Sequence, residues 1–151
     1  MTSWITHSEE ETRAVGAALA RELAPDGVLL LSGDLGAGKT VLARGVAEGL
    51  GMDPGEVQSP TFTLIREHRG RGEGGGRLVH VDLYRLDGEE TGALGLEELL
   101  AGPGVKVVEW AERLPFAVPG ARILRLARRA AGGREITEAT SLEPGGSNED
   151  P

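Results

Sequence analysis

The sequence predicts an α/β fold in which helices flank a parallel sheet, and three observations predict it. Residues 28–31 form a short, continuously apolar run, which is typical of a strand buried on both faces of a parallel sheet. A glycine-rich loop follows, and an apolar helical pattern then runs over residues 39–50. Residues 77–83 and 105–110 supply further strands, because both are rich in apolar and β-branched residues.

A helix precedes the first of these strands. Ser8 and Glu11 have the spacing of a capping box at a helix start. Apolar residues then recur at helical spacing as far as Leu23. The sequence Pro-Asp-Gly at residues 25–27 ends this helix.

The middle of the chain predicts a hairpin and one more helix. Residues 61–67 and 77–83 have the composition of strands, and the glycine-rich segment 69–77 between them is typical of a flexible turn. We therefore expect these two strands to pair as a hairpin. A helix is expected over residues 89–100, although two glycines weaken it.

The last strand is expected over residues 121–128. From about residue 137 the chain is polar and acidic, and it contains glycine and proline, which is typical of disordered segments. The sequence therefore predicts one domain over residues 1–136 and a disordered tail over residues 137–151.

Composition and charge exclude several classes of function. The chain has 151 residues and no cysteine, so disulfides and thiolate metal sites are excluded. Its net charge of −8 argues against unspecific binding to DNA or RNA, which needs a basic face. The N-terminus lacks the basic and apolar regions of a signal peptide, and no apolar run is long enough to cross a membrane. We expect a cytoplasmic protein.

Residues 33–40, GDLGAGKT, match the phosphate-loop pattern G-x-x-x-x-G-K-[ST] at every fixed position. A glycine turn before a helix would match the same letters, but here an apolar strand precedes the loop and an apolar helix follows it. Lys39 brings a compact positive charge to the β- and γ-phosphates, and the Thr40 hydroxyl is a hard oxygen ligand for Mg²⁺. The sequence therefore predicts a site for ATP and Mg²⁺. The glycines that let the loop wrap an anion are Gly33, Gly36 and Gly38.

Two acidic residues follow predicted strands. Such a loop needs a further carboxylate to hold the metal's water shell, usually at the end of another buried strand. Asp82 and Glu109 both occupy such positions, and the carboxyl ends of parallel strands converge on the ligand crevice. A helix cap or a solvent-facing charge is the alternative for each.

Other candidates are weaker. The segment SPTFT, residues 59–63, lies where many nucleotide switches keep a hydroxyl that senses the γ-phosphate, but a proline-containing turn explains it equally well. Partial burial in the core is favoured for Trp110 over stacking on a ligand. The arginines around residues 69–77 are expected at a solvated hairpin tip rather than in a lid over phosphates. The histidines share no metal-ligand spacing and are assigned no chemistry; they are His7, His68 and His80.

Taken together, GDLGAGKT, SPTFT, HVDLYR and VVEW occur in the order that is typical of one family. The chain resembles TsaE (also called YjeE), the ATPase of bacterial tRNA threonylcarbamoyladenosine biosynthesis. The resemblance covers roughly residues 8–136. It implies a P-loop fold with a mostly parallel sheet. The phosphate loop is common to a very large superfamily, whereas SPTFT with DLYR and EW is specific.

The resemblance also implies a function. Members of the family bind ATP and hydrolyse it slowly, and they work with a transferase heterodimer of TsaB and TsaD. That heterodimer modifies the adenosine beside the anticodon in tRNAs that read ANN codons. The chain would therefore meet tRNA only through that complex, and would not itself transfer the threonylcarbamoyl group.

Site residues follow from the resemblance motif by motif. Asp82 and Glu109 would act at the metal together with Thr40, and Thr61 would sense the γ-phosphate. Val41 stands where the family commonly has a second threonine, so a hydroxyl contact is lost and weaker nucleotide binding is expected. The phosphate-binding residues would be Gly33, Gly36, Ala37, Gly38, Lys39, Thr40 and Val41, and those edging the nucleotide would be Glu9, Glu11 and Arg134.

Two rival functions remain open on the residues alone. Small-molecule kinases share this size and this loop, but they need an acceptor pocket and usually a mobile lid. A nucleotide-binding switch without relevant turnover is the second rival. Phosphate release with and without the heterodimer, together with a screen for a phosphorylated metabolite, separates the three.

Overall fold

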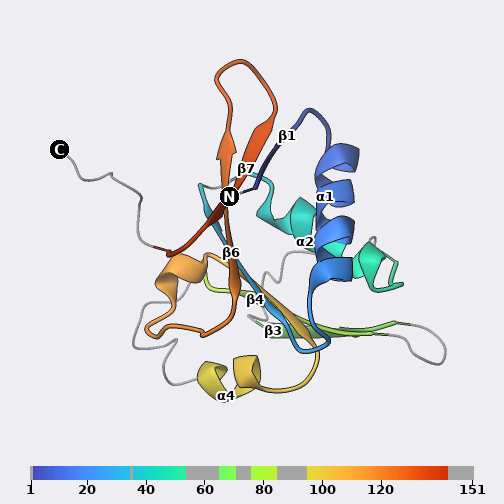
Figure 1. Cartoon of the computed structure of the whole chain (residues 1–151), viewed down its shortest axis with the longest axis vertical. Coiled ribbons are helices and arrows are strands. Elements are labelled where there is room, and N and C mark those ends of the chain that lie inside the picture. Colours follow the sequence, from blue (N-terminus) through green and yellow to red (C-terminus); the bar gives the residue numbers. More distant parts are fainter. Residues whose placement is uncertain (1, 35, 54–64, 71–75, 85–94, 143–151) are drawn as a thin grey trace.

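The computed structural model describes residues 2–34, 36–53, 65–70, 76–84 and 95–142 (Figure 1). Its elements form one seven-stranded sheet with helices on both faces, and the strand order is β1-β7-β6-β2-β5-β4-β3. The strands are β1 (Ser3–Thr6), β2 (Val28–Gly33), β3 (Ile65–Arg69), β4 (Arg77–Asp82), β5 (Val105–Glu109), β6 (Arg122–Arg128) and β7 (Arg134–Ala139). The helices are α1 (Glu9–Glu22), α2 (Lys39–Gly49), α4 (Leu96–Ala101) and the 3₁₀ helix η2 (Ala111–Arg113).

The centre of the sheet is parallel and its edges are antiparallel. Strand β2 pairs in parallel with β5 and β6, and β5 pairs in parallel with β4. The hairpin β3–β4 closes one edge, and β6, β7 and β1 form antiparallel pairs at the other. This arrangement confirms the predicted α/β fold, in which the core strands of the sheet are parallel, and the predicted hairpin. The carboxyl ends of β2, β4, β5 and β6 therefore lie at the same edge of the sheet.

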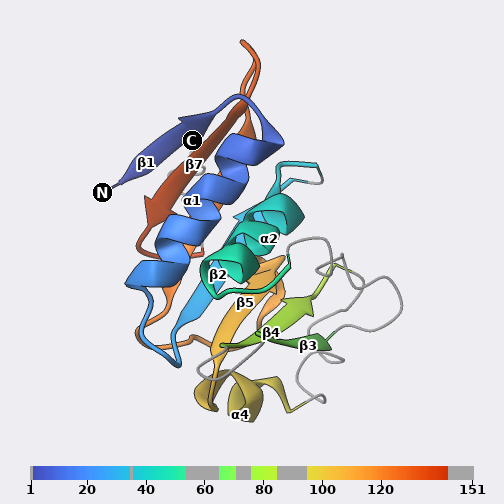
Figure 2. The same ribbon diagram turned by 90° about the vertical axis from the view of Figure 1, so that its right-hand side faces the viewer.

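Helices α1 and α2 lie side by side over one face of the sheet (Figure 2). Leu19, Leu42 and Val46 are fully buried between these helices and the strands. The helices approach so closely that a Cβ atom on Gly45 would lie 2.1 Å from the carbonyl oxygen of Arg13. The opposite face is covered by α4 and by the segment around η2, with a second apolar cluster beneath them. This packing holds the start of α2 rigidly against the carboxyl ends of the central strands.

The first helix begins as its capping pattern predicts. The Ser8 hydroxyl accepts a hydrogen bond from the Glu11 amide at 3.1 Å, which satisfies one free donor of the first turn. The Glu11 carboxylate accepts from the His7 amide at 2.7 Å, one residue before the position that a standard capping box uses. These two hydrogen bonds together fix the direction in which the chain enters α1.

The structure also corrects the sequence interpretation at both ends of the chain. Strands β1 and β7 were not predicted, so the strand that ends at Arg128 is not the last. Strand β7 continues to Ala139, so an ordered strand occupies the first residues of the expected tail. Of the helix expected from residue 89, residues 89–94 lie outside the described part of the chain, and α4 begins at Leu96. Within the described ranges, no helix is long and apolar enough to cross a membrane.

Candidate functional site

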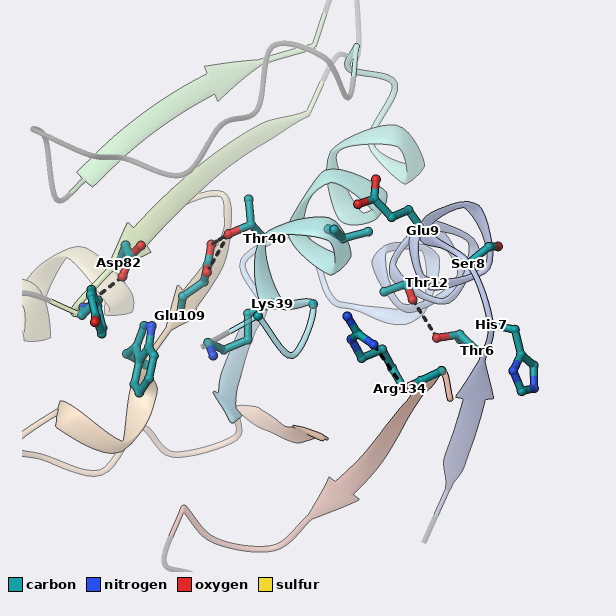
Figure 3. Close-up of a pocket in the computed structure, with 16 residues that line it drawn as sticks. Thr6, His7, Ser8, Glu9, Thr12, Lys39, Thr40, Asp82, Glu109 and Arg134 are labelled. Atoms are coloured by element: carbon teal, nitrogen blue, oxygen red, sulfur yellow. Dashed lines mark hydrogen bonds between the residues drawn. The ribbon is translucent and has the colours of Figure 1, made fainter. Parts of the chain in front are cut away.

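A cavity of about 520 Å³ opens where the carboxyl ends of the central strands meet the start of α2 (Figure 3). Its volume is in the range typical of small-molecule sites. The figure shows Asp82 and Glu109 on one side of Lys39 and Thr40, with Glu9 and Arg134 on the other. The predicted residues that line it are Glu9, Gly36, Gly38, Lys39, Thr40, Val41, Asp82, Glu109 and Arg134.

The remaining predicted residues lie elsewhere. Gly33 ends β2 and is not among the residues that line the cavity. The side chain of Ala37 is fully buried in the core, and its amide donates to the Asp34 carbonyl at 3.1 Å. Glu11 caps α1 instead of lining the cavity. Thr61 and the SPTFT segment lie outside the described residues.

The phosphate loop has the backbone that its glycines were expected to permit. The φ angles of Gly33, Gly36 and Gly38 are 143°, 80° and 107°, a region that residues with a Cβ atom rarely adopt. Gly38 is the N-cap of α2 and has no side chain to satisfy the first amides of the helix. Those amides and the positive end of the helix dipole therefore face the cavity, which suits a phosphate group.

Lys39 is held by backbone oxygens of the loop. Its Nζ atom donates to the carbonyl of Gly33 at 2.5 Å and to that of Asp34 at 2.8 Å, and the residue is only 4% exposed. The ammonium also lies 4.2 Å from the ring centroid of Trp110, a cation–π contact. Burial lowers the pKa of Lys39, while nearby carboxylates, chiefly that of Glu109, oppose the shift.

Trp110 occupies an unusual backbone position next to Glu109. Among the described residues it is the one non-glycine residue with a positive φ, 58°, which is strained for so large a side chain. This turn brings its ring against that of Tyr84, with the centroids 4.9 Å apart, and over Lys39. The ring also packs against the second apolar cluster, so the expected partial burial is confirmed.

Thr40 and Glu109 are joined by a forked hydrogen bond. The Thr40 hydroxyl donates to the two carboxylate oxygens of Glu109 at 2.9 and 3.0 Å, as Figure 3 shows. Because the hydroxyl proton points to Glu109, the lone pairs of Thr40 Oγ1 remain available to a metal ion. Glu109 is only 3% exposed. This hydrogen bond therefore joins the last residue of the phosphate loop to the last residue of β5.

Asp82 lies beside Glu109 in the register of the sheet. The two residues are direct partners across the parallel pair β4–β5, so their side chains leave the same face. The carboxylate of Asp82 accepts a hydrogen bond from the Tyr84 amide at 2.9 Å, and the residue is 7% exposed. Both predicted acidic residues thus stand at strand ends within the cavity rather than at a helix cap or on the outer surface.

His80 is a site residue that the sequence analysis missed. Its Nε2 atom lies 2.5 Å from Glu109 Oε2, and its side chain is fully buried. The spacing of the histidines does not indicate this role, because His80 contacts a carboxylate 29 residues away in the sequence. The useful signal was a histidine inside an apolar strand, two residues before Asp82 on the same face.

The far end of the cavity is formed by the N-terminal strand and the β6–β7 hairpin. The hydroxyls of Thr6 and Thr12 share a buried hydrogen bond of 2.7 Å, which ties β1 to α1. Arg134 begins β7 and lines the cavity opposite the acidic pair, as does His7. Strand β1 reaches this position only because it pairs with β7, so the two unpredicted strands build this wall.

The residues present fit a nucleotide with its metal ion. Within the described residues, no three histidines, cysteines or carboxylates cluster as a complete metal cage. Mg²⁺ usually takes one or two carboxylates and keeps waters and substrate phosphates as its other ligands. Thr40, Asp82 and Glu109 supply the hard oxygens of such a partial set, and Lys39 with the start of α2 supplies positive charge for phosphates.

Comparisons with known proteins agree with this geometry. A family model described as "Threonylcarbamoyl adenosine biosynthesis protein TsaE" matches residues 6–136. A tRNA threonylcarbamoyladenosine biosynthesis protein TsaE from Bacillus subtilis is 44% identical over 135 residues, which cover 89% of this chain and 82% of the relative. Its namesake from Treponema pallidum is 39% identical, with 89% and 98% covered.

A solved structure gives the same result. The crystal structure of YdiB from Bacillus subtilis superposes with a TM-score of 0.69 and 38% sequence identity, and the match covers 91% of this chain and 83% of that one. The residues matched by the family model include the phosphate loop, both acidic strand ends, strand β6 and the first residues of β7. With the fold, the family model and the relatives in agreement, the chain belongs to the TsaE family.

Proposed function

We propose that this chain binds ATP with Mg²⁺ in the 520 Å³ cavity and hydrolyses it slowly, and that TsaB and TsaD stimulate the hydrolysis. The activity would serve threonylcarbamoyl modification of the adenosine beside the anticodon in tRNAs that read ANN codons. The chain would act in the cytoplasm and would meet tRNA only through the transferase heterodimer. Relatives that carry the name of this biosynthesis, 44% identical in one case, support the pathway.

One observation carries the ATP-binding part of the proposal: the forked hydrogen bond from Thr40 to Glu109 beside the ammonium of Lys39. At the start of α2, Thr40 supplies a hydroxyl with free lone pairs, Glu109 a carboxylate and Lys39 a positive charge. A phosphate chain with a bound cation needs these three groups together. Bound Mg²⁺, held by Thr40 and Glu109, would neutralise negative charge on the phosphates.

The chain's own residues would bind and orient ATP more effectively than they activate water. Glu109 already accepts hydrogen bonds from Thr40 and His80, and Asp82 accepts one from the Tyr84 amide. These hydrogen bonds support the proposal that both carboxylates would hold the metal side of the site and that neither would act as a strong general base. Slow unaided hydrolysis follows from this arrangement.

The heterodimer would then stimulate hydrolysis by ordering a segment of this chain around the γ-phosphate. We propose that SPTFT, residues 59–63, is the segment that the heterodimer orders, with Thr61 as the hydroxyl that senses the γ-phosphate. This segment lies outside the described residues, and its position between α2 and β3 supports the proposal.

Phosphate release tests the proposed function. The chain is assayed alone and with TsaB and TsaD from the same organism, and the products are screened for any phosphorylated metabolite. Stimulated phosphate release without such a metabolite is expected, and Thr61→Ala should lose the stimulation while it keeps ATP binding. Equal turnover with and without the heterodimer would reject partnership, and a phosphorylated metabolite would restore the small-molecule kinase.

A further inference from the structure

His80 stands behind the cavity rather than in its wall. It lies in β4 among apolar residues, with Leu78 and Asp82 on the same face of the strand. Both neighbours are buried, and Asp82 lines the cavity whereas His80 does not. Any effect of His80 on a bound ligand must therefore pass through a residue that does line the cavity.

The sheet register brings His80 to Glu109. Asp82 is the direct partner of Glu109 across β4–β5, and His80, two residues earlier, is its diagonal neighbour on the same face. The Nε2 atom of His80 lies 2.5 Å from Glu109 Oε2. An ionised carboxylate can only accept, so the imidazole Nε2–H donates this hydrogen bond.

The other imidazole nitrogen has a different environment. His80 Nδ1 is buried and makes no hydrogen bond to any residue in the described ranges. A histidine that served only to cross-link the core would be expected to use both nitrogens, because a buried polar atom without a partner costs free energy. Among the residues that the structure describes, the contact with Glu109 is therefore the polar interaction that accounts for a histidine at this position.

The contact also restricts how Glu109 can turn. Its Oε2 atom is held by His80, while both carboxylate oxygens accept from Thr40 Oγ1. A carboxylate held from behind keeps its remaining lone pairs aimed at the cavity, and groups that orient a metal-binding carboxylate in this way change metal affinity strongly.

From these contacts we propose that His80 is a positioning residue that orients the Glu109 carboxylate and so sets how much Mg²⁺ strengthens ATP binding. The inference rests on the proposed function, since it concerns the same site. It assigns to the first residue of the HVDLYR motif a role that acts through Glu109 and not through contact with the nucleotide.

The test compares two substitutions that differ in hydrogen bonding. His80→Leu replaces the donor with an apolar side chain of similar size, whereas His80→Gln supplies an amide N–H at a reach similar to that of Nε2. Each variant is titrated with a fluorescent ATP analogue, once with MgCl₂ and once with EDTA. We expect His80→Leu to reduce the gain in affinity caused by Mg²⁺ roughly ten- to a hundredfold, with the affinity in EDTA unchanged. His80→Gln should keep most of the gain.

Two controls keep the result interpretable. In a Glu109→Gln background, His80→Leu should cause no further loss, because the group that it orients is already altered. If His80→Leu fails to fold, as judged by thermal unfolding, His80→Asn replaces it, because the shorter amide does not reach Glu109. The comparison of His80→Asn with His80→Gln then gives the same contrast.

The outcomes separate this inference from the proposed function. An unchanged Mg²⁺-dependent gain in His80→Leu would overturn the positioning role while ATP binding stands. An equal loss of affinity with MgCl₂ and with EDTA would also overturn it, because that pattern indicates core packing. If the unaltered chain binds no ATP under either condition, the proposed function fails, and this inference fails with it.

Discussion

Replacing Lys39 by methionine should weaken ATP binding while leaving the chain folded. Lys39 Nζ donates to the carbonyls of Gly33 and Asp34 and lies over Trp110. These contacts hold the ammonium at the mouth of the loop, where it can transfer to a phosphate. Methionine keeps the length and apolar stem of lysine and removes only the charged donor.

The magnitude follows from an exchange of partners. On binding ATP, the ammonium gives up neutral carbonyl acceptors for anionic phosphate oxygens, and a hydrogen bond to a charged group contributes about 1.5–3 kcal/mol. Little further desolvation of Lys39 is needed on binding, since the residue is only 4% exposed. Lys39→Met should therefore lower ATP affinity by about ten- to a hundredfold.

Lys106 offers a matched control within the same chain. It too is buried, and its Nζ atom donates to the carbonyls of Asp26 and Gly102 at the opposite end of the sheet. Burial lowers the pKa of Lys106 as it does for Lys39. Lys106→Met should therefore affect thermal stability comparably and leave ATP affinity intact.

The assay is titration of both variants with a fluorescent ATP analogue, alongside thermal unfolding. Loss of affinity in Lys39→Met alone supports the assignment. If Lys39→Met binds ATP like the parent chain, or if both lysine variants lose ATP affinity to the same extent, Lys39 does not bind the phosphates as proposed.

Three further predictions concern other residues. Asp82→Asn keeps the acceptor for the Tyr84 amide but loses the charge, so heterodimer-stimulated phosphate release should fall much more than ATP affinity; normal hydrolysis would make Asp82 structural. Val41→Thr places a hydroxyl in the cavity wall and should tighten ATP binding by about 0.5–1.5 kcal/mol in the same titration, whereas weaker binding would contradict the proposed loss of a contact. The hydrogen bond from Arg122 lowers the pKa of the Glu138 carboxyl. The pair therefore stabilises the fold fully at pH values above the usual pKa of a carboxyl group, and this stabilisation is lost as the pH falls through the lowered pKa. Urea unfolding should find Glu138→Gln less stable by about 1 kcal/mol at neutral pH, with the difference closing as the pH falls through the lowered pKa of Glu138; a constant difference would exclude the ion pair as its cause.

The centre of the fold could be predicted from the sequence because its signals are local. The strand before the phosphate loop is continuously apolar, and the loop and the start of α2 follow it directly, so one stretch of chain contains the whole pattern. Asp82 and Glu109 were placed by a general property of parallel sheets, namely that strand ends share one edge.

The outer strands and the contact of His80 could not be predicted in this way. Strands β1 and β7 are short and partly exposed, with mixed polar residues, and each is stabilised by pairing with strands distant in sequence. Local patterns carry little information on such pairing. His80 was missed for a related reason, because its meaning depends on a residue in the neighbouring strand.

The positive φ of Trp110 was equally hidden, since a tryptophan is not a residue that predicts such a turn. Its effect on the site is large, because the turn brings the ring over Lys39. Strained positions of this kind are held by the surrounding structure, and a sequence pattern does not reveal them.

The central claim is that ATP bound in this cavity drives the chain's part in tRNA modification. The most direct test is a reconstituted reaction with TsaB, TsaD, a tRNA that reads ANN codons and a threonylcarbamoyl donor, in which modified adenosine is measured over several turnovers. Modification should depend on the chain and on ATP, and at ATP concentrations that do not saturate the variant it should fall with Lys39→Met but not with Lys106→Met. Full modification with Lys39→Met, or with the chain omitted, would contradict the account.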